Sequence, residues 1–204
     1  MKVVLIPCGE TEWHAAGRLL GRVELPLTGA GREQCGSWAQ RLGALGLQRI
    51  LHGPDELATE TAAAVARQLA VPAKELAELA EVDIGLWAGL TEGQLKKRFA
   101  SAHRELRESP LHVQPPGGES LATAAERVTA CIRKQARKNG KQAIGVVMRP
   151  FSFALAKFAL GGGTATELCE AARSATEPVV IEYECPPAQR TPRRTATEPG
   201  SKHG

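Results

Sequence analysis

Three residues of this chain have side chains that could take part in catalysis or anion binding: Cys8, Glu81 and Arg149. Cys8 follows the apolar run 3–6, and Arg149 follows the run 143–148 and precedes a helical pattern at 151–160. Ligands of open parallel sheets bind outside the carboxyl ends of the strands. A deprotonated thiol is a nucleophile, and a guanidinium binds anions through a fork of N–H donors. Glu81 has the chemistry of a proton donor or acceptor.

The elements that must position these residues alternate between two patterns. Short β-branched runs predict strands at 3–6, 49–52, 143–148 and 179–183, and their near-continuous apolar character fits burial on both faces. Apolar residues recur at helical spacing over 35–45, 58–69 and 121–132, and a more polar helical segment covers 91–107. This alternation is typical of an α/β fold with a largely parallel sheet.

Short motifs occur in a fixed order along the chain. The first are Pro7–Cys8–Gly9–Glu10–Thr11–Glu12–Trp13–His14, Gly17–Arg18 and Pro26–Leu27–Thr28. They are followed by Glu60–Thr61–Ala62, the stretch 79–89, Pro116–Gly117–Gly118–Glu119–Ser120 and Val146–Val147–Met148–Arg149–Pro150. Together they resemble the histidine phosphatase superfamily, the phosphoglycerate mutase-like proteins, over residues 2–184. The resemblance implies a three-layer α/β/α sandwich with a mostly parallel central sheet.

The resemblance also assigns catalytic roles to positions of this chain. In the family, a His attacks the phosphoryl group, two Arg and a second His surround its oxygens, and a Glu protonates the leaving group. In this chain, Pro7 and Leu57 stand at the two Arg positions of the family. Cys8 stands at the position of the nucleophilic His, and Arg149 at that of the second His. Only Glu81 is the same residue as in the family. Losing one preorganised donor costs about 3 kcal/mol of transition-state stabilisation. We therefore expect no intact catalytic set, and a catalytically inactive pseudo-phosphatase that serves as a binding or regulatory module.

The alternative is an active phosphomonoesterase that uses Cys8 as nucleophile or Glu81 as acid–base catalyst. Cysteine-dependent tyrosine phosphatases have an Arg six residues after the Cys, where this chain has His14. The Glu10 carboxylate near the thiol is expected to raise the pKa of the thiol and to repel phosphate. A small buried cysteine in the core is the simpler interpretation of Cys8. Beside Arg149, Glu81 is expected to have a lowered pKa and to stay ionised, which does not suit a proton donor.

Residual ligand binding is predicted at four residues, namely Arg149, Glu81, His14 and Arg18. For Arg149 two interpretations stay open. It binds an anion at the mouth of the sheet, or it forms a salt bridge with Glu81 or Glu10 that fills the site. The ligand is expected to be a phosphorylated small molecule or a protein partner.

Metal binding is not predicted. His14 and His52, with Cys8 and Glu81, are residues of metal-ligand types, but their spacing along the chain does not match a regular site. We expect no metal and no cofactor.

The composition of the 204 residues, 43% apolar and 24% charged, suits one folded domain. We predict a histidine phosphatase-like domain over 1–185, with a helical insert at about 91–110, and a basic, Pro/Thr-rich disordered tail over 186–204. The tail carries much of the net charge of +4, so the body is nearly neutral and a nucleic-acid partner is not expected. The five scattered cysteines indicate no disulfide framework. With no long apolar run, we expect a cytoplasmic protein without a membrane partner.

Overall fold

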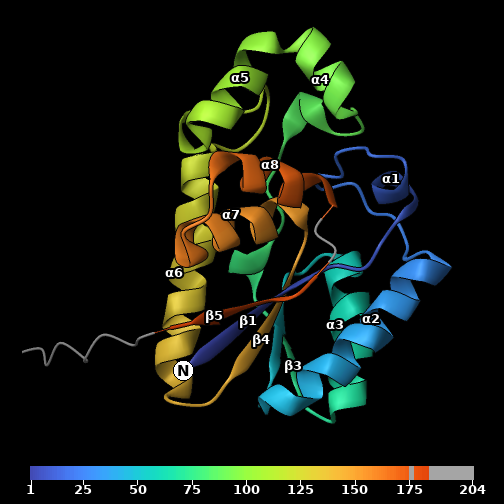
Figure 1. The fold of residues 1–204 in the computed structure, drawn as a ribbon, viewed down its shortest axis with the longest axis vertical. Coiled ribbons are helices and arrows are strands. Elements are labelled where there is room, and N and C mark those ends of the chain that lie inside the picture. The colour runs from blue at the N-terminus through green and yellow to red at the C-terminus, as the bar shows by residue number, and fades with distance from the viewer. Residues whose placement is uncertain (175–176, 184–204) are drawn as a thin grey trace, which may run out of the picture.

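The computed structural model describes residues 1–174 and 177–183. At its centre lies a five-stranded sheet in the order β3-β2-β4-β1-β5 (Figure 1). The strands are β1 (Lys2–Pro7), β2 (Ile50–His52), β3 (Ala73–Glu75), β4 (Ile144–Met148) and β5 (Val179–Glu182). The pairs β1–β4, β2–β4 and β2–β3 are parallel, and β5 runs antiparallel to β1 at one edge.

Helices surround the sheet on both sides (Figure 1). The α-helices of the described residues are α1 (Glu12–Ala15), α2 (Gly29–Leu42), α3 (Glu56–Leu69), α4 (Glu92–Arg98), α5 (Ala100–Glu108), α6 (Leu121–Asn139), α7 (Pro150–Gly161) and α8 (Ala165–Ser174). Single turns of 3₁₀-helix lie at Gly43–Leu45, Ala77–Leu79, Gly85–Trp87 and Pro110–His112.

The central strands are apolar on both faces because each face has its own core. Val3 and Leu5 belong to one buried cluster, together with residues of α6 and α7. Val4 and Ile6 belong to a second cluster, together with residues of α2 and α3. Successive side chains of a strand point to opposite faces, so this alternation puts the sheet between two helical layers. The predicted three-layer α/β fold is confirmed.

The predicted strands and helices are all present, and the structure also contains elements that the sequence did not predict. The four predicted strands are present with ends shifted by no more than one residue. β3 was not predicted because Ala73, Lys74 and Glu75 are all exposed and show no apolar pattern. α1 and α8 were also not predicted, and α6 runs to Asn139, beyond the predicted end at 132. The polar segment 91–107 forms two helices, α4 and α5, separated at Phe99, whose backbone is not helical.

Two of the sequence motifs fix turns that border the carboxyl ends of the strands. The Thr28 hydroxyl accepts a hydrogen bond from the Gly31 N–H at 3.0 Å and so caps α2. Gly85 has a φ of +48°, and a Cβ atom there would lie 2.2 Å from the Pro116 carbonyl oxygen. Only glycine allows this close approach of two loops.

Two expectations concern the ends of the chain and the membrane. The predicted tail at 186–204 lies outside the described residues. Among the helices that the structure describes, none combines the length and the apolar character needed to span a bilayer.

Candidate functional site

The predicted catalytic positions meet at the carboxyl ends of β1 and β4. Pro7 pairs with Met148 in the parallel ladder, and the Cys8 N–H donates to the Met148 carbonyl at 3.0 Å. Arg149 follows directly and is the N-cap residue of α7. The charge of Arg149 acts on Cys8, Glu81 and His14, so these three residues lie near one guanidinium.

Cys8 lies in an apolar environment. It is 5% exposed and belongs to the cluster that contains Leu20, Leu27 and Leu57. Burial raises the pKa of the Cys8 thiol well above its ordinary value, and Arg149 only partly offsets this rise. The sulfur is therefore a protonated thiol at neutral pH. Leu57, at an Arg position of the resemblance, is 1% exposed and fills the same cluster.

Arg149 is bound by the loop that follows α1. Its Nη2 donates to the carbonyl oxygens of Gly21 at 2.6 Å and Val23 at 2.5 Å. Its Nη1 lies 3.0 Å from Glu24 Oε1 and 3.7 Å from Asp55 Oδ1. The salt-bridge interpretation named Glu81 or Glu10 as partner, and both were wrong. Loop packing brings two other carboxylates to the guanidinium.

Glu81 completes the first turn of α7. The N-cap residue of α7 is Arg149, whose side chain has no oxygen that could accept from the free N–H groups of the first turn. Glu81 Oε2 accepts from the Phe151 N–H at 3.0 Å, and Oε1 accepts from the Ser152 N–H at 2.8 Å. Oε1 also accepts from the Val82 N–H at 2.7 Å. The side chain is fully buried and acts as a cap supplied by a distant segment.

The expected lowering of the Glu81 pKa was wrong. Burial raises the pKa of this carboxyl above its ordinary value, and it outweighs Arg149 and the hydrogen bonds from Val82 and Ser152. Desolvation penalises the charged form, and a neighbouring cation whose charge is shared with Glu24 and Asp55 compensates only in part.

His14 caps its own helix. The Thr11 N–H donates to His14 Nδ1 at 3.1 Å, so Nε2 carries the ring proton. Nε2 is buried and has no hydrogen-bond partner among the described residues, and the same holds for Arg149 Nε. Burial, followed by the charge of Arg149, lowers the pKa of His14 to about 4, so the ring is neutral at physiological pH.

The remaining residues considered in the sequence analysis contact neighbouring loops: Arg18 and His52 through backbone carbonyls, and Glu10 through a hydroxyl. Arg18 Nη1 donates to the Gly89 carbonyl at 2.7 Å. His52 Nδ1 lies 2.7 Å from the Gly53 carbonyl. Glu10 accepts from the Thr28 hydroxyl at 3.0 Å. Each of these contacts holds a loop at the mouth of the sheet.

Sequence reasoning missed Glu24, Asp55 and Ser152. Asp55 carried a signal, since it follows β2 after Gly53–Pro54 and so lies at the carboxyl edge of the sheet. Glu24 carried none, because it lies in a long loop whose path only packing decides. Within the described part of the chain, no three His, Cys, Asp or Glu side chains gather to hold a metal ion.

Comparisons with known proteins agree with this architecture. The Bacillus stearothermophilus protein YhfR aligns with a TM-score of 0.75 at 22% identity, covering 90% of this chain and 91% of that one. A phosphoserine phosphatase from Entamoeba histolytica, in complex with 3-phosphoglyceric acid, aligns with a TM-score of 0.75 at 20% identity, covering 88% and 89% of the two chains. Likenesses at this level of identity show the fold.

Sequence relatives reach higher identity over part of their length. Phosphoserine phosphatase 1 of Hydrogenobacter thermophilus is 27% identical over 72% of this chain and 70% of its own. The metal-independent phosphoserine phosphatase of Arabidopsis thaliana is 31% identical over 72% of this chain and 63% of its own. The bifunctional protein Rv2228c of Mycobacterium tuberculosis is matched over only 35% of its length. Residues 3–168 match the family model described as histidine phosphatase superfamily (branch 1), and the chain belongs to that superfamily.

Proposed function

We propose that this chain is a catalytically inactive histidine phosphatase-like protein, a pseudo-phosphatase that serves as a binding or regulatory module. The observation that carries the proposal is the environment of Arg149. The guanidinium is bound by two carbonyls and two carboxylates of the chain itself, and its side chain is fully buried. A cation neutralised in this way does not stabilise the equatorial oxygens of a transferring phosphoryl group.

The nucleophile position supports the same proposal. Cys8 is a buried thiol with a raised pKa, whereas nucleophilic attack needs a thiolate. Pro7 before it has neither a charge nor an N–H donor. Leu57, at the position where the resemblance implies a second guanidinium, belongs to an apolar cluster.

The surroundings of Glu81 also support an inactive site, although its pKa by itself does not. A raised pKa would suit a general acid, so Glu81 is the feature that most favours an active enzyme. Both of its oxygens, however, accept hydrogen bonds from backbone N–H groups, and the side chain is 0% exposed. In this environment the carboxyl holds α7 in place and has no path to a leaving group.

The ligand of the module, in this proposal, is a protein partner or a phosphorylated small molecule. Residual affinity for an anion would use the two buried donors without partners among the described residues, His14 Nε2 and Arg149 Nε. Glu24 and Asp55 oppose it, because their carboxylates lie within 4 Å of the same guanidinium. The relatives that are named phosphoserine phosphatases make phosphoserine the first substrate to test.

The test is hydrolysis of phosphoserine and of para-nitrophenyl phosphate by the purified full chain. The Hydrogenobacter phosphoserine phosphatase 1 is the positive control, and Cys8→Ser is the matched variant because it changes a single atom of the side chain. We expect phosphate release at the level of buffer for both the wild type and Cys8→Ser.

The opposite results are equally specific. Turnover that is lost in Cys8→Ser, with a phosphorylated Cys8 found by intact-mass analysis, would establish the cysteine-dependent phosphomonoesterase. Turnover that survives in Cys8→Ser would point to Glu81 and an activated water. Either result ends the proposal that the site is inactive.

A further inference from the structure

A basic surface lies far from the site described above. Residues 127–166 contain no Asp or Glu, although the whole chain has 22 acidic residues. Within this segment, α6 buries one face in the core, through residues such as Val128, Ile132 and Ala136. The C-terminal half of its exposed face, with the turn that follows, carries five cations, which we call the α6 basic surface: Arg133, Lys134, Arg137, Lys138 and Lys141.

The cations of this surface have no partners in the described part of the chain. In the described part of the chain, no side chain of the five forms a hydrogen bond or comes within 4 Å of a carboxylate, whereas Arg127, earlier on α6, lies 2.8 Å from Glu119 Oε2. Two acids lie near α6: Glu119 pairs with Arg127, and Glu78 is close enough to affect Cys131. Burial, followed by the charge of Glu78, raises the pKa of the Cys131 thiol, and Lys134 lowers it. The positive charge of the surface is therefore largely uncompensated.

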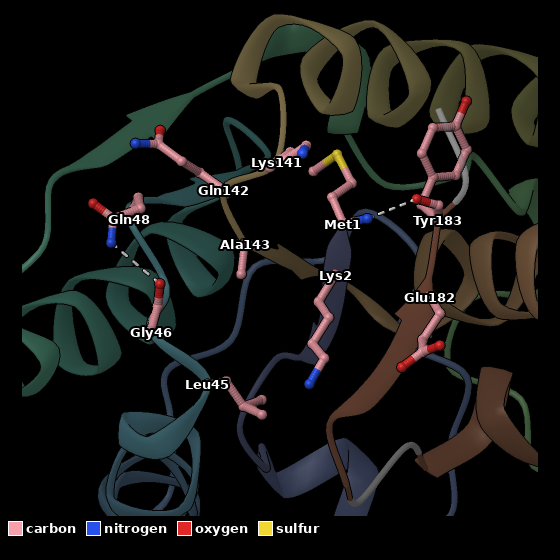
Figure 2. Close-up of a pocket in the computed structure, with 10 residues that line it drawn as sticks. All are labelled: Met1, Lys2, Leu45, Gly46, Gln48, Lys141, Gln142, Ala143, Glu182 and Tyr183. Carbon is pink, nitrogen blue, oxygen red and sulfur yellow. Dashed lines mark hydrogen bonds between the residues drawn. The ribbon is translucent and has the colours of Figure 1, made fainter. Parts of the chain in front are cut away.

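The surface continues into a pocket of about 810 Å³ beyond the end of α6. Lys141 and Lys2 line this pocket together with Gln142, Glu182 and Tyr183 (Figure 2). Lys2 begins β1, so the pocket lies at the amino ends of the parallel strands. The site around Cys8 lies at their carboxyl ends, on the opposite edge of the sheet. A partner bound here would leave that site uncovered.

The spacing of the cations fits an extended acidic chain. Arg133 and Arg137, like Lys134 and Lys138, are four residues apart, which separates them by about 6 Å along the helix axis. Alternate side chains of an extended peptide are about 6.6 Å apart. From this match we propose that the α6 basic surface is a docking site for an acidic, extended segment of a protein partner. The proposal does not depend on whether the Cys8 site is catalytically active.

Two other classes of polyanion fit the surface less well. Binding of a helix in a membrane interface is strengthened by apolar side chains that insert, and the large exposed apolar residues in the described part, Leu86 and Val180, do not belong to α6. Duplex nucleic acid carries one charge per about 1.7 Å. The closely spaced phosphates of a duplex would be repelled by the negative C-terminal end of the α6 dipole and by the Glu182 carboxylate. An acidic peptide carries fewer charges, which can be placed away from both.

The experiment measures binding of a fluorescein-labelled all-glutamate octapeptide to the full chain by fluorescence anisotropy. The test variant is Arg137→Gln/Lys138→Gln/Lys141→Gln, because Gln keeps the helix propensity of Lys and Arg. The matched control, Lys96→Gln/Lys97→Gln/Arg104→Gln, removes the same charge from exposed positions of α4 and α5. Circular dichroism verifies that both variants remain folded.

We expect the test variant to bind the peptide about tenfold more weakly and the control less than about twofold more weakly, since exposed ion pairs contribute individually small amounts. Equal losses in the two variants, or no binding by the wild type, would overturn the proposal. A single-stranded or duplex oligonucleotide, or a phosphatidylserine vesicle, that binds more tightly than the peptide and depends on the same three cations would replace the acidic protein segment as the partner.

Discussion

If Glu81 caps α7, replacing it should lower the stability of the fold, and this effect separates a structural role from a catalytic one. In Glu81→Gln, one carboxylate oxygen becomes an NH₂ group. At least one of the N–H groups of Val82, Phe151 and Ser152 then loses its acceptor and faces another donor. A buried N–H without a partner costs about 1–3 kcal/mol, and the lost hydrogen bond adds a comparable amount. We expect the free energy of unfolding to fall by about 3 kcal/mol.

The measurement is equilibrium unfolding in urea, followed by tryptophan fluorescence. For a chain of this size, each kcal/mol lowers Tm by about 2–4 °C, so the thermal midpoint should fall by about 9 °C. Glu78→Gln is the matched control, because that side chain is exposed and only its backbone carbonyl accepts from Arg127. It should change stability by less than about 0.5 kcal/mol. A Glu81→Gln variant as stable as the wild type would refute the assignment of Glu81 as the cap of α7.

Three further predictions concern other parts of the same framework. Arg149→Met should lower the free energy of unfolding by about 3–5 kcal/mol in urea, since it leaves carboxylates and carbonyls of a buried site without their cation, whereas Arg133→Met on the surface should be nearly neutral. The lowered pKa of His14, about 4, means that its ring takes up a proton more readily in the unfolded chain. Its contribution to stability is therefore present above pH 6.5 and is lost as the pH falls toward 4. Urea unfolding at several pH values should show a shallower decline for His14→Gln, and an NMR titration with a midpoint near the usual 6.5 would contradict this. Gly85→Ala should lose more than about 2 kcal/mol of stability by thermal unfolding, because the new Cβ would collide with the Pro116 carbonyl at a positive φ.

The cap and the loop contacts give the scaffold motifs a structural role that does not depend on chemistry at the site. Gly85, Thr28 and Glu81 each satisfy a local requirement of the backbone: a close approach, a helix N-terminus, and a second helix N-terminus. These requirements hold whether or not phosphate binds.

The sequence alone determined the fold and which residues occupy the positions that the resemblance marks as catalytic. Strands such as 3–6 and 143–148 were predictable because apolar residues filled both of their faces, and the helices because their apolar stripe recurs with the helical period. β3 was not predictable, since three exposed residues at a sheet edge owe their conformation to the pairing with β2.

Only the tertiary structure decided what the site residues contact. Arg149 meets Glu24, which lies 125 residues away in the sequence, because the loop 21–24 folds over the end of β4. The pKa of Glu81 depended on a balance between burial and a cation, and its direction could not be predicted without the depth of burial. Periodicity reports which face of an element is buried, but partner choice for a buried charge depends on where distant loops cross, and no local pattern encodes that crossing.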